Sequence, residues 1–400
     1  MTGLNQQPPT QTVKANFFVL GFRPFFLAAG IFSVVSMLSW LAVYVFYVQI
    51  PLLGLASHYW HAHEMIYGFA MAAVAGFLLT AVKNWTGVQT VQNTPLLILV
   101  LMWFGARISM LLGVDFFTAA AIFDLSFSVC LFVAVLLPIL KVKQWRQAGI
   151  VSKIFLLAVC NMLFYLGLFG VLEKGVYWGL YGGLFLILAL VLTIARRVMP
   201  FFIEKGVDYN VQLKNSTFLD SSNLFIFLAF ALAEVFVQDA RISSYLSTLL
   251  FVISCVRLYN WHTIGIWKKP LLWGLYSSFI FITLGFLLFA LQPYVNLISR
   301  SLALHAFTVG GFGLIILSMM SRVTLGHTGR SVKQPSRWVS MAQWLILAAV
   351  ICRVFLPLVL EGLYVESVFI SQLLWIMGFA LFVLVNYPYL TQPRVDGAEG

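Results

Sequence analysis

Apolar residues form runs of about 20 residues throughout the chain, and short polar or basic segments separate them. A helix of that length crosses the ~30 Å hydrocarbon core of a bilayer. Lipid offers the backbone no hydrogen-bond partners, and the runs leave few polar gaps, so we expect the spans to be helices. The pattern predicts twelve spans, at 17–48, 60–82, 94–113, 115–140, 151–172, 175–200, 217–238, 241–262, 270–291, 300–321, 337–360 and 365–390.

The segments outside these spans leave no room for a soluble domain. Residues 1–16 are polar, include Pro8 and Pro9, and lack the short apolar core of a cleavable signal peptide. We interpret them as a flexible cytoplasmic tail and residues 391–400 as a second cytoplasmic tail. The sequence therefore predicts one all-α polytopic membrane domain over 17–390, with twelve helices in one bundle.

Composition supports this interpretation. The chain is 62% hydrophobic and 9% charged, whereas soluble globular proteins carry roughly 25% charged residues. Too few charged side chains are present to cover a surface that faces water. The four cysteines stand singly in apolar surroundings, where small core residues are the expected role: Cys130, Cys160, Cys255 and Cys352.

The basic residues predict the orientation of the chain. With both termini inside, 19 of the 24 Lys and Arg residues fall in inner segments, 3 fall in outer connections, and Arg107 and Arg353 lie within spans. This asymmetry follows the positive-inside rule. The net charge of +11 thus reflects membrane topology, and we expect no nucleic-acid partner.

Polar and charged residues, whose burial in lipid costs free energy, lie at one depth of the predicted bundle. From the ~1.5 Å helical rise, every clearly intramembrane charge and four of the six histidines fall in the outer half. Each charged residue alone could be a structural ion pair, but together they predict a shared polar cavity, since such residues face the bundle interior and mark functional sites. The set comprises His58, His61, His63, Glu64, Arg107, Asp124, Glu234, His305 and Arg353.

The segment HYWHAHEMIYG, residues 58–68, holds three of these histidines. On a regular helix His61 and Glu64 share a face, whereas His63 points about 160° away from His61. One metal ion cannot easily contact both histidines, so two sites, or one site with a supporting residue, fit better. His58 could also be a loop residue at the interface, and Glu64 a carboxylate that the helix dipole favours.

Span ten supplies a partner for this segment. Placing His63 opposite His305 also aligns Gly68 with Gly310, and residues 86–87 with residues 328–329, at a single offset. This weak repeat predicts parallel helices that carry histidines at one depth, as axial ligands of haem iron require. Arg107 is the first candidate to meet a haem propionate. Copper is the alternative metal, with His58, His61 and Glu64 as local donors.

The two remaining histidines have different surroundings. His262 stands beside Trp261 at the end of a span, which is typical of an interfacial aromatic belt. His327 lies about 33 Å from His305 along a continuous helix, so the two cannot share a metal. We expect structural roles for both, although an inner site that pairs them stays open.

At these residues the chain resembles the NnrS family of bacterial inner-membrane proteins, over most of its length. The resemblance implies twelve transmembrane helices, bound haem and copper, and a role in nitric oxide metabolism and protection from nitrosative stress. Tyr276, Lys83 and Arg196 depart from the pattern, and Tyr276 puts an inner metal site in doubt. The matching segments are GFRPFF (21–26), WHAHEM (60–65), GFLLTAVKNWTG (76–87), ARISML (106–111), RRVMPFF (196–202) and LHAFTVGGFG through SRVTLGHTGR (304–330).

The arrangement is also similar to haem-copper oxidases and nitric oxide reductases, which carry haem-binding histidines on spans two and ten of twelve helices. Such a likeness in fold cannot establish function by itself. The leading hypothesis is a membrane protein with haem b and copper that binds or reduces nitric oxide, with a quinone or cytochrome as electron donor.

In that hypothesis His63 and His305 ligate haem iron, and His61 and His58 offer copper or a second iron contact. Glu64 orients an imidazole or relays protons, so Glu64 and His61 are the candidate catalytic residues. Two rival hypotheses stay open. One is a transporter of copper, haem or an iron–nitrosyl complex, which predicts polar residues through the inner half of the bundle. The other is a sensor or assembly factor that carries haem without catalysis.

Overall fold

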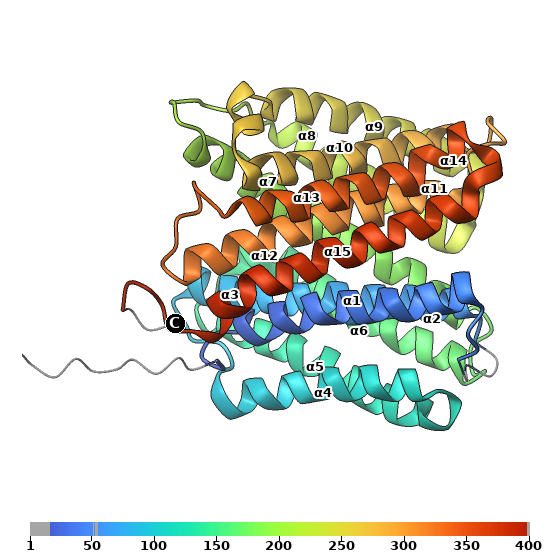
Figure 1. Ribbon diagram of the computed structural model, residues 1–400, viewed down its shortest axis with the longest axis horizontal. Coiled ribbons are helices and arrows are strands. Elements are labelled where there is room, and N and C mark those ends of the chain that lie inside the picture. The colour runs from blue at the N-terminus through green and yellow to red at the C-terminus, as the bar shows by residue number, and fades with distance from the viewer. Residues whose placement is uncertain (1–16, 51, 53–54, 398–400) are drawn as a thin grey trace, which may run out of the picture.

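The structure is a computed structural model that describes residues 17–50, 52 and 55–397. Over these residues every regular element is a helix, and twelve helical rods are long and apolar enough to cross a membrane. The rods run side by side, with their long axes horizontal in Figure 1. The predicted all-α fold with twelve spans is therefore confirmed. The predicted tail at residues 1–16 lies outside the described residues.

The first six rods come from the N-terminal half of the chain. They are α1 (Phe22–Phe46), the continuous rod α2–η1–α3 (Ser57–His63, Glu64–Ala70, Met71–Thr86), α4 (Asn93–Leu112), η2–α5 (Val114–Phe116, Phe117–Lys141), η3–α6 (Trp145–Gln147, Ala148–Leu168) and α7 (Gly175–Gly206).

The last six rods follow in the C-terminal half. They are α8–η4 (Thr217–Leu232, Ala233–Val237), α9 (Ala240–Trp261) with η5 after it (Ile264–Lys268), α10 (Pro270–Leu291), α11–η6–α12 (Arg300–His305, Ala306–Gly313, Leu314–His327), α13–η7–α14 (Arg337–Val350, Ile351–Phe355, Leu356–Val359) and η8–α15 (Glu361–Leu363, Tyr364–Thr391).

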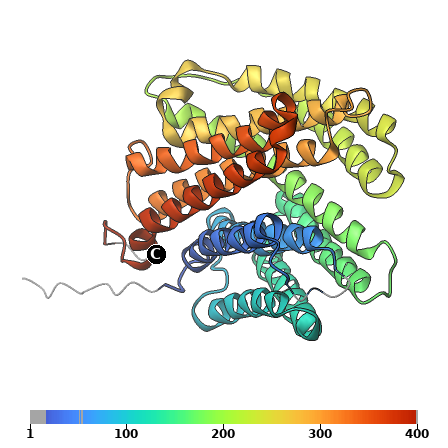
Figure 2. The same ribbon diagram turned by 45° about the vertical axis from the view of Figure 1, so that its right-hand side comes forward.

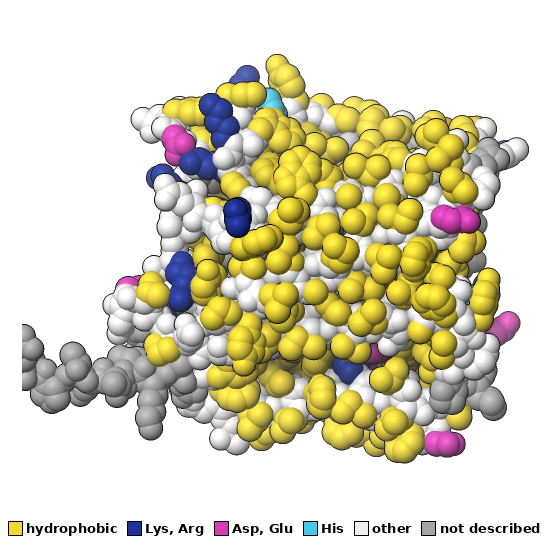
Figure 3. All heavy atoms as spheres, in the orientation of Figure 1, with side chains coloured by type: hydrophobic (Ala, Val, Ile, Leu, Met, Phe, Trp, Pro, Cys, Tyr) yellow, Lys and Arg dark blue, Asp and Glu magenta, His cyan; other side chains and the backbone are white. Residues whose placement is uncertain are grey.

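The beginning of α1 and the end of α15 lie at the same end of the bundle. A buried guanidinium joins them, since Arg23 Nη1 donates to the carbonyl oxygens of Leu390 (2.7 Å) and Gln392 (2.9 Å). On the face that Figure 3 shows, Lys and Arg side chains gather mostly at this left-hand end, and hydrophobic side chains cover the middle. We call this basic end the inner end and the opposite one the outer end, in keeping with the positive-inside rule.

Three rods form the centre of the bundle. In the rods of α2–η1–α3, α10 and α11–η6–α12, 78% of the apolar window is buried, whereas in α8 and α9 only 33% is. The central rods pack on one another, because α10 contacts α11, η6 and α12, and α12 also contacts α3. Figure 2 shows the yellow to red helices of the second half above the blue to green helices of the first. Most side chains on these three central rods therefore face other helices.

Four rods depart from regular α-helix in their outer halves. They contain π-helical turns at η1, η4, η6 and η7, which the apolar pattern does not reveal. A π turn inserts an extra residue and rotates the side chains that follow it, and such turns are frequent at functional sites. In both α2–η1 and α11–η6 the π segment begins directly after a histidine, His63 in one rod and His305 in the other.

Candidate functional site: a histidine-lined cavity at the outer end

A cavity of about 530 Å³ opens between the outer halves of α1, α2–η1, α7, α11–η6, η7 and α15. Its volume falls within the roughly 300–1,000 Å³ typical of cofactor and ligand pockets. Its wall is mostly apolar and aromatic, and its polar groups come from a few side chains. Those most relevant to binding are Trp40, His58, His61, Tyr181, Arg300, Ser301, His305, Arg353, Tyr364, Gln372 and Trp375.

Two imidazoles from different rods line this cavity. His305 is positioned by its own helix, because its Nδ1 lies 2.7 Å from the carbonyl oxygen of Ser301. A carbonyl only accepts, so Nδ1 carries the proton, and the lone pair of the neutral ring is on Nε2. In metal-binding histidines, a hydrogen bond from the ring nitrogen that does not bind the metal fixes the tautomer in this way.

The other imidazole, His61, is positioned by an aromatic ring. Its ring stacks on the indole of Trp40 in α1, with centroids 4.6 Å apart and planes 9° from parallel. Its buried Nδ1 has no hydrogen-bond partner among the described residues. Because buried polar atoms are rarely left unsatisfied, this nitrogen marks a place where the protein is completed by a ligand or water.

Two arginines bring positive charge to the cavity wall. Arg353 Nη2 donates to Ser301 Oγ at 2.9 Å, and its buried Nη1 has no partner in the described part of the chain. Arg300 Nη2 pairs with Glu234 at 2.6 Å, and its guanidinium lies 4.3 Å from the ring centroid of Tyr181. No carboxylate of the described residues forms a salt bridge with Arg353, so the cavity carries a cation that suits an anionic ligand group.

The structure places His63 and Glu64 outside the cavity, in a buried ionic network between η1, α4, α5 and α6. Arg107 Nη1 pairs with Glu64 at 2.6 Å and Arg107 Nη2 pairs with Asp124 at 2.5 Å. Tyr165 donates its hydroxyl to the same Asp124 carboxylate at 3.1 Å. These side chains are almost fully buried, so each charge is compensated by a neighbour rather than by water.

Both ring nitrogens of His63 are taken up in this network. Nδ1 lies 3.0 Å from Glu64 Oε1, and Nε2 lies 3.2 Å from Asn161 Oδ1 and 3.5 Å from Asp124 Oδ2. Both ring nitrogens thus face polar atoms of the network, and His63 is not among the residues that line the cavity. These contacts hold His63 away from the cavity that His305 lines, so the ligation of haem iron by His63 and His305 stays a prediction without support from these contacts. The side chain that shares the cavity with His305 is His61, which points the opposite way from His63.

The structure also differs from three further expectations about how the site residues are arranged. Glu64 does not act with His61, because its carboxylate turns toward His63 and Arg107, so the predicted copper set of His58, His61 and Glu64 is not assembled. Arg107 does not reach the cavity to meet a propionate. The single predicted polar cavity is instead two compartments, a closed ionic network and an open histidine-lined cavity.

The remaining predicted residues are placed as follows. His58 lines the mouth of the cavity and is exposed, and its ring contacts Tyr59. His262 accepts from Trp267 Nε1 at 3.2 Å, and His327 lies 3.5 Å from Asn84. No contact joins these two histidines, and the described residues contain no group of three His, Cys, Asp or Glu side chains suited to a metal ion.

Sequence reasoning missed several uncharged members of both compartments. Trp40, Ser301 and Gln372 belong to the cavity, and Gln372 has two buried polar atoms without a partner among the described residues. Asn161 and Tyr165 belong to the ionic network. Apolar runs contain such residues commonly, so only a helical-wheel alignment with a known neighbour would have singled them out.

Gly68 belongs to the packing of the network rather than to a cofactor site. A Cβ at this position would overlap the ring of Phe32 and lie 3.1 Å from Arg107 Cδ. Its carbonyl oxygen accepts from Trp103 Nε1 at 3.0 Å. Gly68 therefore serves close helix packing.

Comparisons with known proteins agree with this architecture. Ten chains from solved structures match the fold, among them a haem-copper terminal oxidase solved as a dimer by cryo-electron microscopy. That match has a TM-score of 0.63 at 13% sequence identity and covers 94% of this chain and 85% of the oxidase chain. At such low identity the likeness shows the fold alone.

Sequence comparison identifies the family. No curated protein matches the chain. The family described as NnrS protein matches residues 16–394, nearly the whole length. The chain therefore belongs to the NnrS protein family.

Proposed function

We propose that the protein is a haem-binding protein of the bacterial inner membrane that acts on nitric oxide, and that its haem occupies the outer cavity. The observation that carries the proposal is the pair of imidazoles in the wall of one cavity, His305 with its Nε2 lone pair directed away from its own helix and His61 with an unsatisfied ring nitrogen. Neutral imidazoles on separate helices are the usual axial ligands of haem iron.

The other groups of the cavity fit the same cofactor. Aromatic and aliphatic side chains, including Phe69, Phe312 and Trp375, supply flat apolar walls for a macrocycle. Arg353 and Arg300 supply charge for its anionic substituents. The sequence predicted this role for Arg107 first and for Arg353 as well. Among the described residues, His61 Nδ1, Arg353 Nη1 and both side-chain polar atoms of Gln372 lack hydrogen-bond partners, which supports a ligand larger than water.

Bound haem iron would supply the site for nitric oxide binding and for one-electron chemistry. The chain's own part is to hold the ligands and exclude water. The Ser301 carbonyl keeps the His305 proton on Nδ1, and Trp40 holds the His61 ring against rotation. The apolar walls exclude water from the iron, so that a small uncharged ligand such as nitric oxide competes without losing a hydration shell.

Copper enters this proposal only through the family resemblance. The donors predicted for it are divided between the two compartments, so we derive no copper site from this chain. Glu64 lies in the closed network, so a proton relay from Glu64 to the cavity has no support in these contacts.

Transport is a weaker candidate than a one-sided binding site. An ion or metal carrier needs polar groups along its path. Below the cavity, however, the same rods line an apolar crevice with no charged side chain among its lining residues. The outer cavity thus lies at the outer end, and no polar path leads from it through this crevice to the inner end.

The proposal can be tested on purified protein by pyridine-haemochrome analysis and by the Soret absorption band. We expect stoichiometric haem in the wild type, and loss of most haem in the H61A and H305A variants. H262A and H327A are matched controls, because each removes a histidine that does not line the cavity. Anaerobic nitric oxide should then shift the Soret band. Full haem content in both cavity variants would refute the proposal.

A further inference from the structure

A second cavity, of about 270 Å³, lies at the inner end, remote from the histidine-lined cavity. It is built by the connection between α5 and α6, the end of α3 and the inner part of α7. Its wall contains four polar and four apolar side chains. They are Gln144, Arg146, Gln147 and Arg197, and Trp85, Ile150, Ile194 and Val198.

The charge of this cavity is not neutralised by the protein. Arg197 Nη1 donates to Gln147 Oε1 at 2.8 Å, and Nη2 donates to the carbonyl oxygen of Arg146 at 3.0 Å. Both acceptors are neutral, so they fix the guanidinium without cancelling its charge. Within the described residues no carboxylate forms a salt bridge with Arg146 or Arg197. Gln144 Oε1 also lacks a donor in the described part of the chain.

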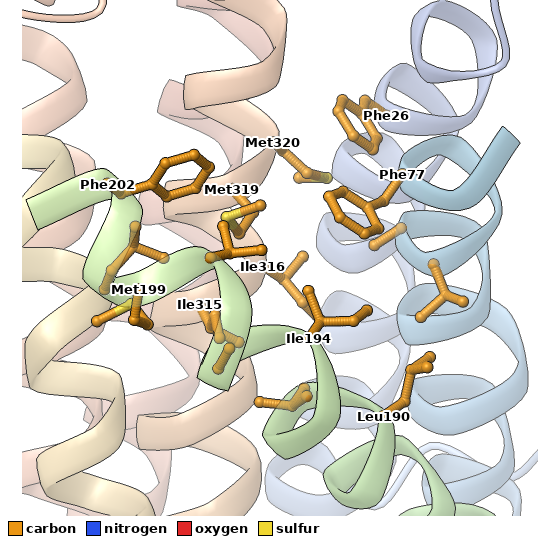
Figure 4. A pocket seen from close by; sticks show the side chains of 16 residues that line it. Phe26, Phe77, Leu190, Ile194, Met199, Phe202, Ile315, Ile316, Met319 and Met320 are labelled. Atoms are coloured by element: carbon orange, nitrogen blue, oxygen red, sulfur yellow. The ribbon is translucent and has the colours of Figure 1, made fainter. Parts of the chain in front are cut away.

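Basic residues at the inner end are expected on topological grounds, so charge alone does not define a site. What distinguishes this cavity is that it shares wall residues with an apolar crevice. Ile194 and Val198 line both. The crevice runs between α7 and the pair α3 and α12, as Figure 4 shows for the side chains of Leu190, Ile194 and Phe202 facing Phe77 and Ile316.

The crevice exists because two rods diverge. In the outer half α7 packs on α2 and η1, whereas further inward its contacts with α3 are sparse. From Leu190 to Val198 the crevice follows α7 for about 12 Å, close to the ~15 Å hydrocarbon depth of one leaflet. The crevice has a volume of about 80 Å³, and at that depth the surrounding solvent is lipid, so a few methylene groups of a hydrocarbon chain are what can fill it.

We propose that the inner cavity and the crevice together bind one anionic phospholipid of the inner leaflet. Its phosphate lies between Arg146 and Arg197, and one acyl chain follows Val198 and Ile194 into the crevice. Arginine presents donors in a fork that matches phosphate oxygens, and basic pockets between helices at the inner face are typical sites for acidic headgroups. A neutral quinone would leave both guanidinium groups without a counter-charge.

The experiment uses the full chain in mild detergent. Dioleoyl phosphatidylglycerol should raise the thermal midpoint of the wild type, and dioleoyl phosphatidylcholine should raise it much less. In the double variant R146Q/R197Q the apparent affinity for phosphatidylglycerol should fall roughly tenfold or more, since two charge-assisted contacts are lost. The matched control is K141Q/K143Q, which removes two exposed lysines of the same connection that do not line the cavity.

Two further measurements distinguish a phospholipid headgroup from free phosphate as the ligand. Inorganic phosphate at the same concentration should give no shift, because it cannot fill the crevice. The variant V198W narrows the junction while keeping both arginines, and it should weaken phosphatidylglycerol binding. Native mass spectrometry of the wild type provides a readout independent of the variants, and should show one retained acidic phospholipid.

Several outcomes would overturn the proposal. They are an unchanged phosphatidylglycerol response in R146Q/R197Q, an equal response to phosphatidylcholine, an equal response to inorganic phosphate, and displacement of the lipid by a neutral isoprenoid quinone. Haem content is measured in parallel and should be unaffected, because neither arginine lines the outer cavity. A failure of the haem proposal would therefore not be confused with a failure of the lipid site.

Discussion

The imidazole of His305 donates to the carbonyl oxygen of Ser301, four residues earlier on the same rod, at 2.7 Å. The Ser301 hydroxyl meanwhile accepts from Arg353 at 2.9 Å. Ser301 thus sets both the tautomer of the candidate iron ligand and the position of Arg353, with which no carboxylate of the described residues forms a salt bridge.

If His305 ligates iron through Nε2, an external imidazole should replace it. The variant H305G removes the ring and leaves a space of its shape beside the cavity. We expect a purified protein with little haem that regains the wild-type Soret band when imidazole and haemin are added, as measured by difference spectroscopy. H327G treated in the same way should neither lose nor regain haem. A spectrum of H305G that does not respond to imidazole would argue against direct ligation.

The stacking of His61 on Trp40 should matter less than ligation itself. An aromatic pair contributes about 0.5–1.5 kcal/mol beyond its buried area, so W40A should release haem roughly 2–12-fold more readily. The dissociation rate can be measured by transfer of haem to apomyoglobin. W40F keeps a ring in place and should stay near the wild type. W344A removes a tryptophan that faces outward on α13, and an equal effect there would show that stacking on His61 is not the cause.

The depth of the histidines in the membrane could be predicted from the sequence, whereas the direction in which their side chains point could not. Apolar runs and basic flanks define where each span begins, and the fixed rise per residue then places His61, His63 and His305 in the outer half. Those expectations agree with the structure. Which of two histidines two positions apart faces the cavity depends on rotation of the rod about its axis, and a membrane helix that is apolar all round gives no moment from which to read it.

Glu64 shows a second limit of sequence reasoning. On a regular helix it lies nearer to the face of His61 than to that of His63. In the structure its carboxylate goes to His63 and to Arg107, because a buried charge goes where its counter-charge lies. The position of Arg107 depends on the packing of α4 against η1, and no local pattern encodes it. The sequence indicates the position of uncharged partners such as Asn161 even less clearly.

The ionic network should be the most sensitive part of the protein to loss of one charge. R107M leaves Glu64 and Asp124 buried without a counter-charge, and removal of one partner from such a group destabilises by about 3–5 kcal/mol. We expect low expression and a clearly lowered thermal midpoint in detergent. The triple variant R107M/E64Q/D124N removes all three charges together and should recover a substantial part of the loss.

The stability that the triple variant recovers shows whether the network stabilises the protein through its charges or through its packing. If the triple variant is as unstable as R107M, the network contributes through shape and hydrogen bonding, and the charge argument fails. Haem content in the triple variant, normalised to folded protein, should remain near the wild type, because none of the three side chains lines the cavity. A selective loss of haem there would instead link the two compartments.

Gly68 offers a test of how tightly η1 packs against the network. An added methyl group would overlap the ring of Phe32 and press on the Arg107 side chain, and overpacking of this kind destabilises by roughly 1–3 kcal/mol. We therefore expect G68A to lower the thermal midpoint. G149A is the matched control, because the nearest atom to its added Cβ is Lys153 Nζ at 3.9 Å, and alanine is favoured over glycine in a helix by about 1 kcal/mol. Equal behaviour of the two variants would mean that η1 has room to move away from α1, and that the network does not depend on this contact.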